Sequence, residues 1–150
     1  MRAIKILAIV FFALIATQAL ANGGNTTFKG NITASGTHFV KGTSSARWSN
    51  ANSQTTTRAH YANFDGETFV SLVAYDKQTD VLLESRIKVA KGQLCMIVEN
   101  SQGEVLLEKT FQKDETIYAQ LTFDVYEHYK IRFIGEATKG SYQCQWTALN

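Results

Sequence analysis

Apolar and polar residues alternate with a period of two through much of the second half of the chain. Residues 117–123, 129–133 and 142–146 each place apolar side chains on one parity and mostly polar ones on the other. This alternation indicates strands that bury one face in a core and expose the other to water. Such runs recur about every ten residues between polar turn signals, a spacing typical of a β-sandwich or barrel.

Four further strands are expected upstream of these, at Glu67–Tyr75, Val81–Ala90, Leu94–Val98 and Glu104–Phe111. Polar or glycine-containing stretches separate the runs and predict turns, among them the stretch around Gly92 and residues 135–140. Residues 81–89 also fit the helical period. The pattern as a whole predicts an all-β protein, an antiparallel β-sandwich of jelly-roll or immunoglobulin-like type with roughly eight to ten short strands.

The first 21 residues have the pattern of a cleaved secretory signal peptide. Arg2 and Lys5 precede a continuous apolar run over residues 6–16, and small residues lead to a predicted cleavage between Ala21 and Asn22. The uncharged stretch is shorter than the roughly 20 residues of a membrane-spanning helix, and no later stretch is apolar enough to span. We therefore expect a secreted or periplasmic protein without a transmembrane segment in the mature chain.

Residues 22–64 differ in composition from residues 65–150. The first segment is rich in Asn, Gly, Ser and Thr, with four basic and no acidic residues, whereas the second contains nine basic and thirteen acidic residues. We predict short strands in 22–64, either part of the sandwich or donated to a neighbouring molecule, and a sandwich body in 65–150. Dense basic clusters typical of nucleic-acid binding are absent from the sequence.

The leading functional hypothesis is an exported, non-enzymatic structural or interaction protein, a self-associating subunit of an extracellular fibre, surface or matrix assembly. Its basis is the basic, acid-free segment ahead of an acidic body, which would let 22–64 add a strand to the sheet edge of another copy. The expected partner is a second copy of the chain or a surface glycan. A further alternative is a β protein that inserts into membranes through its Thr/Ser-rich alternation.

A carbohydrate-binding β-sandwich module is the second hypothesis, because exposed aromatic rings can stack on sugars. The aromatic candidates outside the Phe residues are Trp48, Tyr61, Tyr75, Tyr118, Tyr126, Tyr129 and Trp146. Aromatic residues fill most β cores, so most of these should be buried. Trp48, Tyr126 and Tyr129 have polar neighbours and are the predicted ligand-stacking residues, and the hypothesis requires two or three rings lying coplanar on one exposed face.

The sequence contains no recognisable catalytic or cofactor-binding motif. His38, His60 and His128 are isolated from one another and lack the close spacing of metal ligands. We therefore expect surface histidines, no metal, no cofactor and no enzyme activity. Cys95 and Cys144 are an even pair in an exported chain, which predicts a disulfide, although Leu94 and Met96 place Cys95 on the parity opposite to the core.

Overall fold

The computed structural model describes residues 32–149, and these residues form an all-β fold in which no helix occurs. Every strand pair is antiparallel, as predicted. The strands are β1 (Ile32–Ala34), β2 (His38–Phe39), β3 (Ser44–Ala46), β4 (Ser49–Asn52), β5 (Thr56–Ala74), β6 (Thr79–Asn100), β7 (Val105–Phe111), β8 (Glu115–Phe123) and β9 (His128–Ala148). The described part has no helix that could span a membrane, and the predicted cleavage at Ala21 and Asn22 lies outside it.

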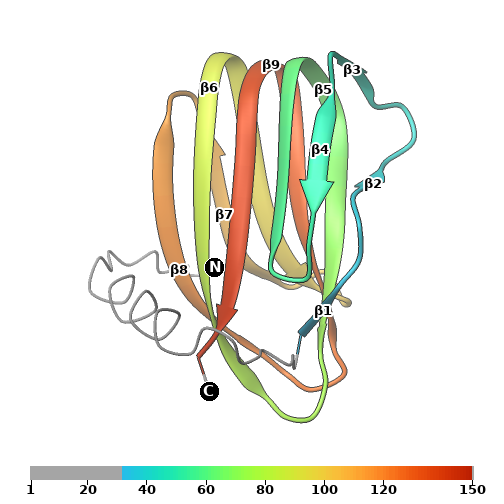
Figure 1. The fold of residues 1–150 in the computed structure, drawn as a ribbon, viewed down its shortest axis with the longest axis vertical. Coiled ribbons are helices and arrows are strands. Elements are labelled where there is room, and N and C mark those ends of the chain that lie inside the picture. The colour runs from blue at the N-terminus through green and yellow to red at the C-terminus, as the bar shows by residue number, and fades with distance from the viewer. Residues whose placement is uncertain (1–31, 150) are drawn as a thin grey trace.

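Three long strands, β5, β6 and β9, build both layers of the sandwich. Each runs up one layer, bends over at the upper end of the molecule and returns in the other layer (Figure 1). One layer has the order β4–β5–β9–β6–β8, and we call it the β8 layer. The other has β1 and β2 beside β5, then β9, β6 and β7, and we call it the β7 layer. The register shifts of the long strands lie at the bends.

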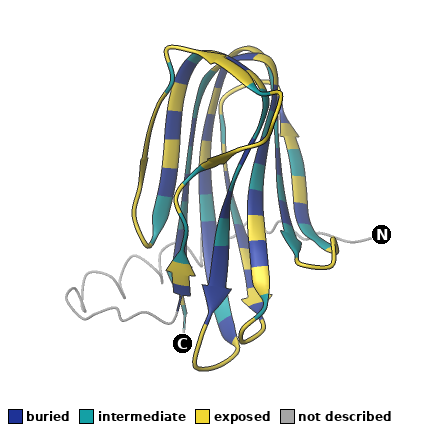
Figure 2. Ribbon diagram, turned by 90° about the vertical axis from the view of Figure 1, so that its right-hand side faces the viewer, coloured by how far each residue is buried: buried dark blue, intermediate teal, exposed yellow. Residues whose placement is uncertain are grey.

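The core lies between the two layers and is lined by the inward parity of each strand, as the alternating dark and light bands in Figure 2 show. Predicted inward residues of 117–123, 129–133 and 142–146 are buried, which confirms the period-two interpretation. The largest fully buried side chains include Trp146, Tyr61, Tyr142, Phe64, Phe111, Phe123 and Phe133. Burying aromatic side chains of this size contributes a large apolar area to folding.

The predicted strands were too short because bends were interpreted as chain reversals. Residues 81–90 and 94–98 belong to one strand, β6, and the stretch around Gly92 is a bend between layers. Residues 135–140 likewise lie inside β9. A glycine-containing polar stretch serves a bend as well as a turn, because both need an unusual backbone conformation at the surface. The helical period of 81–89 has no counterpart, since these residues are strand.

The short strands β1 to β4 pair with β5 of their own chain and cover its outer edge. The compositional boundary between residues 64 and 65 lies inside β5, so the end of the polar segment is part of a central strand. Within residues 32–149 the polar segment is therefore built into the sandwich in cis. Residues 22–31, the remainder of that segment, lie outside the described residues.

The predicted disulfide between Cys95 and Cys144 is wrong, since both residues are free thiols. Cys144 is fully buried between the layers, where the Ser85 hydroxyl donates to its Sγ at 3.3 Å. Cys95 follows the buried Leu94 and so projects from the other face of the β7 layer. A disulfide requires the two Cβ atoms to approach each other, which residues on opposite faces of a sheet cannot do. Burial raises the pKa of the Cys144 thiol to about 12.

Candidate functional site

Trp48, the first predicted stacking residue, packs on the core cluster. Its ring stacks on the buried Tyr61, with centroids 5.5 Å apart and an interplanar angle of 13°. Phe39 meets the same ring edge-on at 5.0 Å, and the indole Nε1 donates to Asn50 Oδ1 at 2.8 Å. With one face on the core and its polar atom satisfied, Trp48 serves as the cover of the core beneath β2, β3 and β4.

Tyr129, predicted to be exposed, is buried at 3% relative exposure. It stacks on Phe123 with centroids 4.1 Å apart and an interplanar angle of 10°. Its hydroxyl accepts a hydrogen bond from the backbone N of Asp124 at 2.8 Å, and burial raises its pKa. Tyr129 therefore belongs to the inward parity of β9, where it anchors the loop that follows β8.

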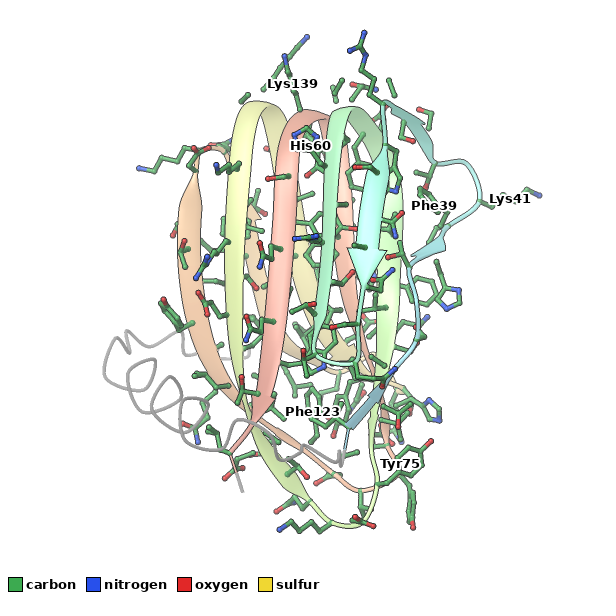
Figure 3. The ribbon with its side chains drawn as sticks, viewed as in Figure 1. Phe39, Lys41, His60, Tyr75, Phe123 and Lys139 are labelled. Atoms are coloured by element: carbon green, nitrogen blue, oxygen red, sulfur yellow. The ribbon has the colours of Figure 1, made fainter. Side chains whose placement is uncertain are left out.

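Tyr126, the third predicted residue, is the most exposed of the large hydrophobic side chains among residues 32–149, at 66%. Its partner is Tyr75, 43% exposed, whose ring centroid lies 5.8 Å away at an interplanar angle of 68°. Val125, 38% exposed, adjoins them. We call these three residues the tyrosine corner; the name describes their place at the end of this sandwich and not the hydrogen-bonded tyrosine corner of immunoglobulin-like domains. Figure 3 shows Tyr75 projecting from the lower end of the sandwich, at the opposite end from Lys139.

Two loops that are distant in sequence form the tyrosine corner. The β5–β6 loop contributes Tyr75 and the β8–β9 loop contributes Tyr126, whose backbone N donates to the Ala74 carbonyl at 2.7 Å. The side chains of Gln78 and Asp124 join the same two loops, with Nε2 donating to Oδ1 at 2.8 Å. Together with the Tyr129 anchor, these bonds hold together the two loops that carry the rings.

Backbone strain accompanies one of the two exposed rings, that of Tyr126. Tyr126 has a φ of 64° and Asp76 a φ of 61°, both in the left-handed region. Asp tolerates this region, whereas a bulky residue such as Tyr seldom occupies it, so the strain lies at Tyr126. Such a conformation costs about 1–3 kcal/mol, and it recurs at binding and catalytic sites. A bulky ring kept both strained and exposed contributes little to folding, which points to a role at the surface.

Polar side chains border the tyrosine corner. Asp76, Lys77 and Gln78 are exposed and follow Tyr75 directly, while the exposed Asp124 precedes Val125 on the other loop. The corner thus presents two apolar ring faces next to carboxylate, ammonium and amide groups. Burial of an apolar face beside a few oriented polar groups is the usual composition of a small-ligand site.

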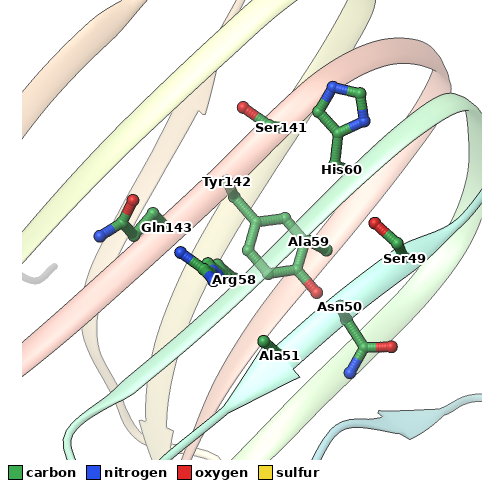
Figure 4. A pocket seen from close by; sticks show the side chains of 9 residues that line it. All are labelled: Ser49, Asn50, Ala51, Arg58, Ala59, His60, Ser141, Tyr142 and Gln143. Carbon is green, nitrogen blue, oxygen red and sulfur yellow. The ribbon is translucent and has the colours of Figure 1, made fainter.

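A second candidate surface lies on the outer face of the β8 layer. A hollow of about 260 Å³ lies over β4, β5 and β9, where Arg58 is beside Gln143 and His60 beside Ser141 (Figure 4). A larger hollow of about 630 Å³ adjoins it, shares His60 and Ser141, and reaches β6 and the upper bends. We call the larger one the basic hollow, because Arg47, Lys88 and Lys139 line it with His60.

The histidine and acidic side chains of the described residues do not gather into a metal-binding cluster. Residues 32–149 contain no group of three or more His, Cys, Asp and Glu side chains placed to hold a metal ion. His38, His60 and His128 are all exposed, and His38 stacks on Phe69 with centroids 5.0 Å apart. On the β7 layer, Arg132 bridges Glu67 and Glu99 through contacts of 2.6 and 3.1 Å, and these contacts raise its pKa. This arrangement is a satisfied ion-pair network.

Sequence comparison finds no match for this chain, either among protein-family models or among curated proteins. Solved structures with a similar fold include the C-terminal family 6 carbohydrate-binding module of a laminarinase from Zobellia galactanivorans, at 11% identity and a TM-score of 0.43, covering 77% of this chain and 99% of the module. A β-(1,4)-mannanase of Podospora anserina carrying a family 35 module gives 12% identity and a TM-score of 0.45, covering 81% of this chain and 29% of that one. A family 29 carbohydrate-binding module in complex with mannohexaose gives 15% and 0.38, covering 81% and 93%.

Proposed function

We propose that this protein is a non-enzymatic carbohydrate-binding module and that the tyrosine corner is its glycan-binding site. The observation that carries the proposal is the contact between Tyr75 and Tyr126, two exposed rings held by two loops at one end of the sandwich. One face of a pyranose ring presents C–H groups, which pack favourably on the electron-rich face of an aromatic ring. The hydroxyl groups of the sugar would then reach Asp76, Gln78 and Asp124.

The angle between the rings bears on the form of the ligand. At an interplanar angle of 68°, Tyr75 and Tyr126 do not make the coplanar platform that the sequence hypothesis required. A sugar lying flat on one ring meets the edge of the other, so the corner accommodates a single residue from two sides. This geometry suits a chain end, a branch or one sugar of a soluble chain better than the flat surface of a crystalline polysaccharide.

Self-association by strand donation, the leading hypothesis from the sequence, has no supporting contact among residues 32–149. The strands that would be donated, β1 to β4, lie on β5 of the same chain. Donation of β1 to β4 to another copy would have to break these pairs first. The exposed, strained corner gives glycan binding a specific surface, and for this reason we place it first.

A glycan array probed with the purified protein, followed by calorimetric titration of the best ligand, tests the proposal. Replacing both rings, Tyr75→Ala with Tyr126→Ala, should weaken binding by about 2 kcal/mol or more, roughly thirtyfold, because stacking residues at the centre of a site dominate affinity. The matched pair Tyr75→Phe with Tyr126→Phe keeps both ring faces and should retain most of the affinity. Phe39→Ala removes an exposed ring far from the corner and should have no effect. Unchanged binding by the double alanine variant would show that the corner is not the site.

A further inference from the structure

The basic hollow on the β8 layer owes its shape to small residues on three neighbouring strands. Ala62 of β5, Ala90 of β6 and Ser141 of β9 line it. His60, Ser141 and Lys88 are direct cross-strand neighbours, so the small serine lies between two long side chains. The volume of about 630 Å³ is within the range of about 300–1,000 Å³ that small-ligand sites occupy.

The side chains that border this hollow are mostly basic and unpaired. The side chains of Arg47, Lys88, Lys139 and His60 make no ion pair or hydrogen bond with any residue between 32 and 149. Asp114 is the single acidic residue among the lining residues, and its Oδ1 already accepts a hydrogen bond from the Val89 backbone N at 2.9 Å.

Arg47, Lys88 and Lys139 outnumber Asp114 in the lining, so positive charge is in excess here, and three further features bear on this excess. Lys91 lies directly opposite Lys139 across the β6–β9 pair, and like charges in that position repel each other. Glu115, the acid next to Asp114 in sequence, is instead paired with Lys109 at 3.4 Å. Arg47 reaches the hollow from a strained backbone with a φ of 53°, the conformation already seen at the tyrosine corner. An anion bound in the hollow would lie beside Lys139 and offset part of its repulsion with Lys91, which is not among the lining residues.

We infer that the basic hollow binds an oxyanion, the carboxylate or sulfate ester of an acidic polysaccharide. The inference uses the proposed function only to choose a polysaccharide as the carrier of the anion. Lys88 and Lys139 act as the charge partners from two neighbouring strands, and Arg47 closes the hollow from the β3–β4 side. A nucleic acid fits less well, because Tyr61, the one aromatic residue with His60 in the lining, is buried and offers no exposed ring for base stacking.

Matched pairs of charged and uncharged polymers test this assignment with the full chain. Polygalacturonate is compared with its methyl ester to test a carboxylate, and dextran sulfate with dextran to test a sulfate ester. We expect one charged member to bind at least tenfold more tightly than its neutral partner at low salt. The apparent affinity for it should fall as salt rises, because bound cations are released from the polymer.

Lys88→Gln with Lys139→Gln should lower affinity for the charged polymer about tenfold and flatten its salt dependence. Lys41→Gln with Lys130→Gln removes the same charge elsewhere and should change affinity less than twofold. Equal losses in the two double variants, equal binding of charged and neutral polymers, or equally tight binding of single-stranded DNA would each overturn the inference. The double alanine variant of the tyrosine corner separates the two proposals. If the corner is not a site, that variant binds like the wild type while the lysine variants still report on the hollow.

Discussion

Replacing Gly92 with alanine should destabilise the fold far more than the same replacement at Gly103, although both glycines have left-handed backbones. Their φ angles are 72° and 82°. Gly92 lies at the bend where β6 passes from the β8 layer to the β7 layer, and Gly103 lies in the turn between β6 and β7. The comparison therefore separates the cost of the backbone conformation from the cost of crowding at the bend.

The magnitude follows from the surroundings of the added methyl group. In both variants alanine must adopt a left-handed conformation, which costs about 1–2 kcal/mol. A Cβ on Gly103 would meet nothing within 4 Å, whereas a Cβ on Gly92 would overlap with the carbonyl oxygens of Glu136 and Ala137 in β9. These are backbone atoms, so the overlap requires the paired bend of β9 to move, and overpacking of this kind costs typically about 1–3 kcal/mol more.

Urea unfolding followed by tryptophan fluorescence measures the difference, because Trp146 is buried in the core. We expect a loss of about 1–2 kcal/mol for Gly103→Ala and about 2–5 kcal/mol for Gly92→Ala, the latter a large part of the 5–15 kcal/mol typical of a domain. The slope of the free energy of unfolding against urea concentration should be the same for both variants, since both keep the same fold and expose the same surface on unfolding. Equal losses in the two variants would refute the argument that β6 bends around a crowded glycine.

The two cysteines give the remaining predictions. In the native protein without reductant, an aromatic disulfide reagent should modify Cys95, which is half-buried on the outer face, while Cys144 should react only after unfolding. If fewer than two thiols per chain react after unfolding in denaturant, Cys95 and Cys144 are paired and the prediction of a disulfide was right. Since burial raises the pKa of Cys144 from 9.0 to about 12, the folded state keeps a proton that the unfolded chain loses in this interval. The contribution of the Cys144 thiol to the free energy of unfolding is thus fully present below pH 9. It is lost as the pH rises toward 12, by at most about 1.4 kcal/mol per pH unit. Urea unfolding between pH 8 and 11 should show this decline in the free energy of unfolding, and the decline should be less steep in the Cys144→Ala variant. Equal pH dependence of the two proteins would show that burial of the Cys144 thiol does not cause it.

The layers of the sandwich could be predicted from sequence, and the paths of its long strands could not. Alternation over residues 117–123 and 142–146 identifies the buried parity because each residue reports its own environment. Whether the chain reverses or bends at Gly92 depends on the strand that pairs with the residues beyond it. That partner, β9, lies about 40 residues further along the chain, so no local pattern contains the information.

The candidate site shows the same division between local and long-range information. Tyr126 could be selected from its polar neighbours, but Tyr75 was one of several aromatic candidates until the fold brought the two loops together. Tyr129 was misplaced although it alternates with Lys130 and therefore had the inward parity from the outset. Its polar neighbours suggested exposure and the period-two alternation suggested burial, and the alternation was right. In a strand, the residue next to an exposed charged residue generally points to the opposite, buried face.

The folded structure groups the charged residues differently from their order in the sequence. The sequence divides into a basic segment and an acidic body, which suggested that one part binds the other. In the structure, Arg47 from the basic segment lines the same hollow as Lys88 and Lys139 from the acidic body. Basic residues of both parts thus lie together, where they repel rather than neutralise one another. An arrangement that costs folding free energy and leaves an open hollow between the charges is better explained by an external anion than by an internal partner.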